Sequence, residues 1–152
     1  MQNRQFLREK WPFRWWGYNG LEAIATPQPL VAGDIVDFDW NPPDKARIVA
    51  YLNSATPLLM TLGLPESCGL CDELVNPNED MSDDVWMWPS RLGHDVEMHG
   101  AYLPDAMVEH IRRCDYRPLA CGGRSMEAYP FPLRDVERLG FRLSDGALTR
   151  KE

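Results

Sequence analysis

The chain carries the stretch CGLC at residues 68–71 and, after a gap of 22 residues, the stretch HDVEMH at residues 94–99. Thiolate sulfur and imidazole nitrogen are ligands that zinc prefers, and a Cys-x-x-Cys turn can present both sulfurs to one point. Cys68, Cys71, His94 and His99 are therefore the predicted ligands of a tetrahedral zinc ion. On this interpretation a zinc-knuckle-like element organises the fold, with residues 76–84 as an inserted loop.

The spacing of the two histidines constrains the backbone that carries them. Five positions along a regular helix turn the chain by roughly 140° beyond one full turn, because each residue contributes about 100°. His94 and His99 can therefore reach one ion only if the helix opens at its last turn. Gly100 follows His99, and glycine is the usual residue where a helix ends in a left-handed conformation.

The same residues allow other interpretations. Cys68 and Cys71 could form a redox dithiol, but the acidic segment after Cys71 disfavours the thiolate that such chemistry needs. The four residues could also be unrelated, with His99 packed in the core. Cys114 and Cys121 are candidate replacement ligands if one histidine does not bind the ion.

Length and composition bound the architecture. With 152 residues, 13 Pro and 11 Gly, the chain fits one domain built from short elements. We expect an aromatic-rich N-terminal strap at 1–29, a core with the metal site at 30–118 and a C-terminal extension at 119–152. No apolar run approaches the roughly 18 residues of a membrane span, and the first ten residues are polar and basic. These features predict a cytoplasmic protein without membrane contact, whose cysteines are ligands or buried thiols.

Segments of period 2 and period 3.6 occur without regular alternation, which predicts an α+β fold in which a small antiparallel sheet packs against three or four helices. Strands are expected near 34–40, 57–63 and 84–88. Helices are expected near 43–55, 90–99 and 104–114, with a short one at 132–139. In the first strand Asp37 and Asp39 alternate with apolar residues, which gives it an acidic outer face.

The charge of the chain limits its partners. It has 23 acidic and 16 basic residues and a net charge of −7, which disfavours binding to nucleic acid and favours a basic protein. The acids include Asp34, Asp37 and Asp39. A second group forms an expected acidic loop at Glu79, Asp80, Asp83 and Asp84. Asp34, Asp37 and Asp39 could be a hard-cation site, but they lack a Gly-bearing loop with the full oxygen-ligand spacing.

The leading functional hypothesis is a zinc-stabilised acidic protein-binding module. Its most specific form is an immunity or antitoxin protein that neutralises a basic toxin, because acidic inhibitors of basic proteins gain association rate and specificity from their charge. Trp15, Trp16, Asp37 and Asp39 are the predicted partner-binding residues, as aromatic anchors within an acidic rim. The two tryptophans could instead pack on the body of the domain.

Two alternative functions use the same metal. A zinc-dependent hydrolase or deaminase-type enzyme needs an open coordination position and a general acid or base, for which Glu73 and Glu97 are candidates. A nucleic-acid-binding zinc finger is the second alternative, which the negative charge disfavours. Because no nucleophile-base pair is evident, we expect a binding protein and assign no catalytic residue.

Residues 84–99, DVWMWPSRLGHDVEMH, continue into YLPDAMV at 102–108. This block resembles a segment of small uncharacterised bacterial proteins, in which a Cys-x-x-Cys precedes a run from Trp-Pro through two histidines to a Leu-Pro that opens the next helix. The resemblance covers roughly residues 39–112, and Asp95 stands where that pattern usually has an aromatic residue. It implies a shared fold core and the same four ligand positions, and no activity.

Overall fold

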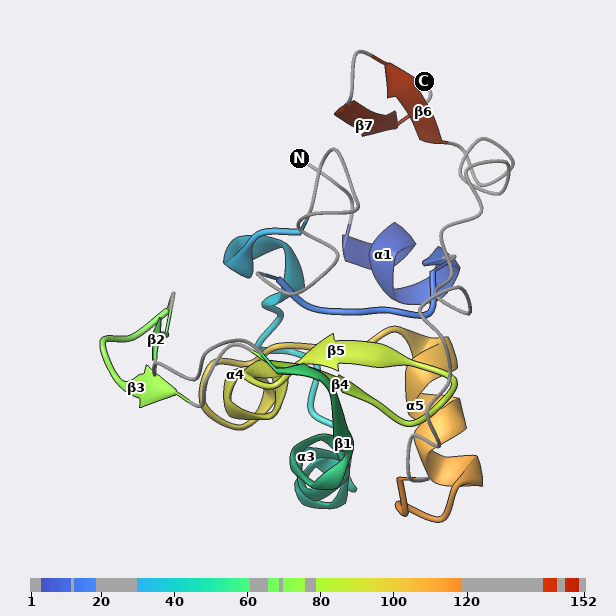
Figure 1. Ribbon diagram of the computed structural model, residues 1–152. Helices are drawn as coiled ribbons and strands as arrows, with labels where there is room; N and C mark the ends of the chain where they lie inside the picture. The colour runs from blue at the N-terminus through green and yellow to red at the C-terminus, as the bar shows by residue number, and fades with distance from the viewer. Residues whose placement is uncertain are drawn as a thin grey trace.

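The computed structural model describes residues 4–11, 13–18, 30–60, 66–68, 70–75, 79–118, 141–144 and 147–150 (Figure 1). Within these ranges the chain has the predicted α+β fold, a small antiparallel sheet with helices packed around it. The helix predicted at 132–139 and Cys121 lie outside the described residues. No helix in the described ranges is long and apolar enough to span a membrane.

Three of the helices in the described ranges correspond to expected ones. The helices described are α1 (Arg4–Lys10), the 3-10 helix η1 (Ala32–Ile35), α3 (Lys45–Ser54), α4 (Leu92–Met98) and α5 (Asp105–Arg113). The strands are β1 (Thr56–Met60), β2 (Glu66–Ser67), β3 (Leu74–Val75), β4 (Glu79–Ser82), β5 (Met87–Pro89), β6 (Phe141–Ser144) and β7 (Ala147–Arg150). The three predicted core helices are α3, α4 and α5, whereas the polar sequence of α1 did not indicate a helix.

The main sheet has three antiparallel strands in the order β1-β4-β5. Its central strand is β4, in which Met81 pairs with Pro57 of β1 on one side and with Trp88 of β5 on the other. The strands predicted near 57–63 and 84–88 are therefore confirmed in part, but they lie on either side of β4 and do not pair with each other. Residues 61–63 lie outside the described part.

The predicted acidic loop is wrong for Glu79 and Asp80, whereas Asp83 and Asp84 lie in a turn. Glu79–Ser82 is the central strand, and Asp80 and Asp83 are only 6% and 1% exposed. Asp83 can be buried because its carboxylate accepts hydrogen bonds from the backbone N–H groups of Val85 and Trp86, which close the turn into β5. An acidic side chain can lie in the interior when backbone N–H groups are positioned to donate hydrogen bonds to it. A prediction from charge alone therefore placed this segment wrongly at the surface.

The strand predicted near 34–40 is also wrong. The chain forms η1 there, followed by a single antiparallel bridge between Val36 and Ala101 and a turn at residues 38–39. Phe38, which alternation assigned to the buried face, is 78% exposed.

Aspartate side chains explain why this segment is not a strand. The Asp34 carboxylate accepts a hydrogen bond from the Val31 N–H at 3.0 Å, and the Asp37 carboxylate accepts one from the Asp39 N–H at 3.0 Å. Such local bonds fold the backbone back on itself and compete with the ladder that a strand requires.

The N-terminal segment packs on the body of the domain. Trp15 bridges Met87 in parallel, and the Trp16 N–H donates to the Met87 carbonyl at 2.9 Å, so the segment runs beside β5. The Trp16 indole donates to the Tyr102 carbonyl at 2.8 Å, and the rings of Trp11, Trp15 and Trp16 meet edge to face. These contacts fix the segment as part of the core.

Trp15 and Trp16 are 1% and 0% exposed. Their prediction as partner-binding residues is therefore wrong, because a fully buried ring cannot anchor another protein. The alternative, that both pack on the domain, is confirmed. The Trp11 ring contacts both indoles, and the Trp16 ring also packs on Tyr102.

A polar cluster joins the start of α3 to the end of α5. Arg112 donates two hydrogen bonds to the Asp44 carboxylate, at 2.9 and 3.0 Å, and the Tyr116 hydroxyl donates a third at 2.5 Å. The Arg47 guanidinium lies 3.7 Å from the centre of the Tyr116 ring. Chiefly because of the bonds from Arg112, the pKa of Asp44 lies well below the usual range of a carboxyl.

Replacing Asp44 with asparagine is expected to lower the free energy of unfolding at pH 7 by about 1 kcal/mol, since the partner Arg112 is partly exposed and solvent screens the pair. A depressed folded pKa stabilises the fold above the unfolded value, near 3.9, and this contribution is lost as pH falls through the folded pKa. Asp44→Asn should therefore flatten the acid limb of the stability profile, measured by urea unfolding between pH 2 and pH 7.

Asp115→Asn is the matched control, because Asp115 forms only a long, highly exposed pair with Arg117 at 4.0 Å. It should leave the same profile unchanged. Equal acid profiles for the wild-type chain and Asp44→Asn would contradict the assignment.

Candidate metal centre

Two separate elements carry the four predicted ligands. Cys68 and Cys71 lie in the connection between β2 and β3, which pair antiparallel as a short hairpin. The Cys68 N–H donates to the Glu73 carbonyl at 2.9 Å and closes this connection, while the Leu70 N–H points at the Cys68 sulfur at 3.4 Å. These two backbone hydrogen bonds hold the Cys68 sulfur in a fixed position in the turn.

The end of α4 has the geometry that the histidine spacing requires. The helix ends at Met98, His99 leaves helical geometry at φ −127° and ψ 11°, and Gly100 has φ +67°. A side chain at Gly100 would also collide with the Phe38 ring, because an added Cβ would lie 2.6 Å from it. The predicted opening of the last turn is confirmed, and glycine is required there for both backbone conformation and space.

The four ligand atoms converge. The two sulfurs and two Nε2 nitrogens all lie within 4.8 Å of one another. Cys68 Sγ is 3.5 Å from His99 Nε2, Cys71 Sγ is 3.6 Å from His94 Nε2, and the two Nε2 atoms are 3.2 Å apart. With bond lengths of about 2.3 Å to sulfur and 2.0–2.1 Å to nitrogen, a tetrahedral ion would separate S from N by about 3.5–3.6 Å and N from N by about 3.3 Å. The side chains could therefore hold a metal ion with little rearrangement.

The electrostatics of the group also fit a cation. A hydrogen bond with the Glu73 backbone lowers the pKa of the Cys71 thiol, but desolvation and the adjacent Cys68 thiol together raise it above its ordinary value. The two sulfurs and two imidazole nitrogens direct lone pairs toward one another, and a metal ion at their centre would supply the positive charge that favours bound thiolates.

Asp95 lies behind the ligands and was not predicted. It is fully buried, accepts hydrogen bonds from the Cys68 thiol at 3.7 Å and the Tyr18 hydroxyl at 3.4 Å, and its second oxygen makes no bond within the described residues. Burial raises its pKa to about 6. The position next to His94 is the only sequence signal for it, because Tyr18 is distant in the chain.

The remaining predicted site residues lie elsewhere. Cys114 follows α5 and contacts His110, so it does not join the group, and Cys121 is outside the described residues. Within the described ranges, Asp34, Asp37 and Asp39 do not form a cation-sized cluster. The carboxylates of Asp34 and Asp37 instead stabilise local turns, so the hard-cation interpretation is not supported.

Asp37 and Asp39 nevertheless lie close to the end of α4. The Asp37 N–H donates to the Gly100 carbonyl at 2.9 Å, which fixes this turn one residue beyond the ligand His99. Asp39 is exposed, and Asp37 is partly buried. Both therefore belong to the surface next to the candidate metal centre.

No protein-family model matches the chain, and neither does a curated protein or a solved structure. The resemblance of residues 39–112 to small bacterial proteins therefore stays a prediction. The candidate metal centre is supported by its ligand geometry alone.

Replacing Cys68 with serine is expected to remove most of the bound metal from protein purified without chelator and to lower the melting temperature. The physical reason is that the four ligands come together only in the folded chain, so the free energy of metal binding adds to the free energy of folding. Elemental analysis should give close to one metal ion per wild-type chain and well below one for Cys68→Ser.

Cys114→Ser makes the same chemical change outside the group and should keep the full metal content. Equal metal content in the two variants, or none in the wild-type chain, would show that the four residues do not bind an ion.

Proposed function

We propose that the chain is a zinc-stabilised protein-binding module in which the metal is structural. The observation that carries this proposal is that two sulfurs and two nitrogens lie within 4.8 Å of one another, with two S–N distances and the N–N distance at tetrahedral values that suit zinc. Four protein ligands also complete the tetrahedral shell. No coordination position then remains for a reactive water or a substrate.

A structural ion would connect elements that have little else to hold them together. The β2–β3 hairpin has only two residues in each strand, and a two-stranded hairpin is marginally stable alone. Zinc bound by Cys68 and Cys71 on the hairpin and by His94 and His99 on α4 would fix the position of the hairpin. Its exposed side chains would then form a defined surface.

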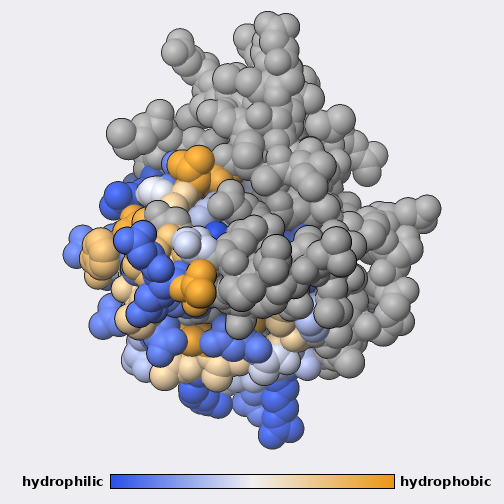
Figure 2. All heavy atoms as spheres, turned by 60° about the vertical axis from the view of Figure 1, so that its left-hand side comes forward, coloured by the Kyte–Doolittle hydropathy of each residue, from blue (hydrophilic) through white to orange (hydrophobic). Residues whose placement is uncertain are grey.

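That surface combines apolar side chains with acids. Leu74 on the hairpin is 72% exposed, Met98 at the end of α4 is 57% exposed, and Phe38 rests against Gly100. We call these three residues and the exposed acids beside them in the sequence the knuckle face. The acids are Asp39, Asp72, Glu73 and Glu97. Figure 2, which brings the left-hand side of Figure 1 forward, shows hydrophobic residues among hydrophilic ones on the described part of this side.

The knuckle face supports binding to a basic protein. Exposed apolar anchors within a charged rim are the usual anatomy of a specific interface, and the net charge of −7 would accelerate encounter with a positively charged partner. Phe38 and Met98 thus take the anchoring role that the buried Trp15 and Trp16 cannot fill. The most specific form of the proposal is an immunity or antitoxin protein that neutralises a basic toxin.

The enzyme alternative keeps Glu73 beside the candidate ligands, where its backbone carbonyl accepts the Cys68 N–H, but its other candidate base lies elsewhere. Glu97, one of its two candidates, lines a surface hollow with Lys45, Ala46 and Val49 of α3. None of these neighbours is a metal ligand. A hydrolase or deaminase-type mechanism would also require water to replace one of the four ligands, so binding is the function that the geometry favours.

The test uses the tagged, zinc-loaded chain to capture its partner from the native host and then measures binding kinetics with the purified partner. Asp39→Lys should slow association and weaken its dependence on salt, because it removes steering charge. Phe38→Ala should speed dissociation by about tenfold or more, because it removes a side chain that would be buried in the complex.

Glu109→Lys on α5 makes the same change of charge as Asp39→Lys at another exposed site and controls for net charge. Recovery of no basic partner, or equal effects of the two charge reversals, would contradict the proposal. Zinc-dependent hydrolysis of a small substrate that is lost in Glu73→Gln would instead favour the enzyme.

A further inference from the structure

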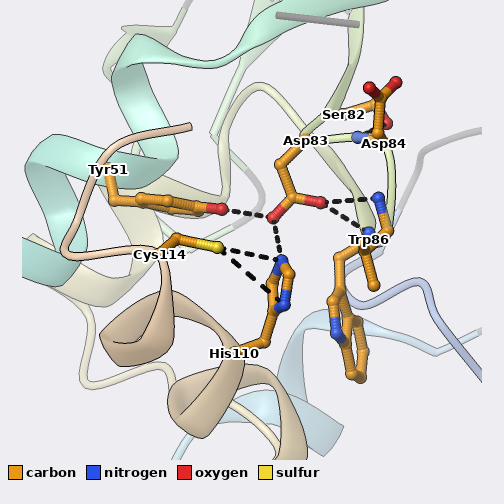
Figure 3. A network of polar contacts seen from close by, with 8 residues as sticks. Tyr51, Ser82, Asp83, Asp84, Trp86, His110 and Cys114 are labelled. Carbon is orange, nitrogen blue, oxygen red and sulfur yellow. Dashed lines mark hydrogen bonds and ion pairs between the residues drawn. The ribbon is translucent and has the colours of Figure 1, made fainter. Parts of the chain in front are cut away.

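A second polar cluster lies outside the candidate metal centre, where α3, α5 and the turn before β5 meet (Figure 3). It contains a thiol, an imidazole, a carboxylate and a phenol, from Cys114, His110, Asp83 and Tyr51. His110 Nε2 lies 2.9 Å from the Asp83 carboxylate, and the Cys114 sulfur lies 3.6 Å from His110 Nε2 and 4.0 Å from Nδ1. A thiol beside an imidazole that is held by a carboxylate is the arrangement of a nucleophile activated by a neighbouring base.

Asp83 is the fixed point of the cluster. One carboxylate oxygen accepts the N–H groups of Val85 and Trp86, and the other accepts the Tyr51 hydroxyl and His110 Nε2. Burial, together with the bond to Asp83, raises the pKa of Tyr51, so its phenol remains protonated and donates. With both oxygens engaged, the carboxylate can hold the imidazole in one orientation.

This arrangement assigns roles to the two ring nitrogens. Because Nε2 donates to the Asp83 carboxylate, the neutral ring keeps its free lone pair on Nδ1. The Cys114 sulfur lies within 4.0 Å of both ring nitrogens and nearer to Nε2, and Nδ1 is the one able to accept the thiol proton. The three groups therefore form a chain of contacts. The carboxylate orients the imidazole base, and the base assists the thiol nucleophile.

The cluster also has a direction from the interior to the surface. Asp83 is buried, whereas His110 and Cys114 are only partly buried. Among the described residues the thiol is therefore not fully enclosed, which leaves access for a small reagent.

We infer that Cys114 is a base-assisted thiol that a small hydroperoxide oxidises to a sulfenic acid, at a modification site separate from the metal centre. The thiol proton passes to His110 Nδ1 while the sulfur attacks one peroxide oxygen. The S–O bond forms as the O–O bond breaks, and the leaving oxygen takes the proton from Nδ1. Sulfur loses two electrons and the peroxide gains them, so the products are the sulfenic acid and water or an alcohol.

The test treats the zinc-loaded chain, carrying Cys121→Ser to remove the other free cysteine, with hydrogen peroxide. Sulfenic acid at Cys114 is trapped with dimedone and measured by peptide mass spectrometry, for native protein and for protein unfolded in urea. The native thiol should react about tenfold faster or more, despite its partial burial, because only the folded chain supplies the base.

His110→Gln should reduce the native rate to the level of the unfolded chain, and Glu109→Gln, its neighbour on α5, should leave it unchanged. If His110→Gln does not fold, the native-to-unfolded ratio of the parent chain decides alone. A native rate at or below the unfolded rate, or a His110→Gln rate equal to that of the parent, would show that Cys114 is simply a packed thiol.

Discussion

The convergence of two sulfurs and two imidazole nitrogens on one point is the constraint on which this end of the molecule depends. It requires α4 to end at Met98 so that His99 can turn toward His94, and Gly100 allows that ending. The same glycine admits the Phe38 ring and, through its carbonyl, fixes the turn at Asp37. One helix terminus therefore shapes both the ligand set and the surface beside it.

The rest of the domain is held by ordinary packing. The aromatic N-terminal segment runs beside β5, and Trp88 packs on Tyr51 of α3 while its indole donates to the Leu52 carbonyl. Buried Asp83 then ties the turn before β5 to α3 and α5. On the proposed function, this core would not depend on the metal, whereas the small β2–β3 hairpin would. Loss of metal should therefore loosen the hairpin before it unfolds the core.

Short-range patterns explain what the sequence could predict. The ligands follow from spacing within two stretches, and α3, α4 and α5 follow from the 3.6 periodicity of their apolar residues. The failures share a different cause, which is side chains that bond to the backbone or to distant residues. The carboxylates of Asp34 and Asp37 form turns where a strand was expected. Asp83 is buried because local backbone N–H groups and two distant side chains, those of Tyr51 and His110, donate to it.

X-ray absorption at the zinc edge tests the central claim most directly, because it reports the atoms bound to the ion. The geometry predicts two sulfur ligands at about 2.3 Å and two nitrogen ligands at about 2.0–2.1 Å, and loss of one nitrogen in His99→Ala. A shell without sulfur, or one unchanged in His99→Ala, would contradict a zinc ion held by Cys68, Cys71, His94 and His99.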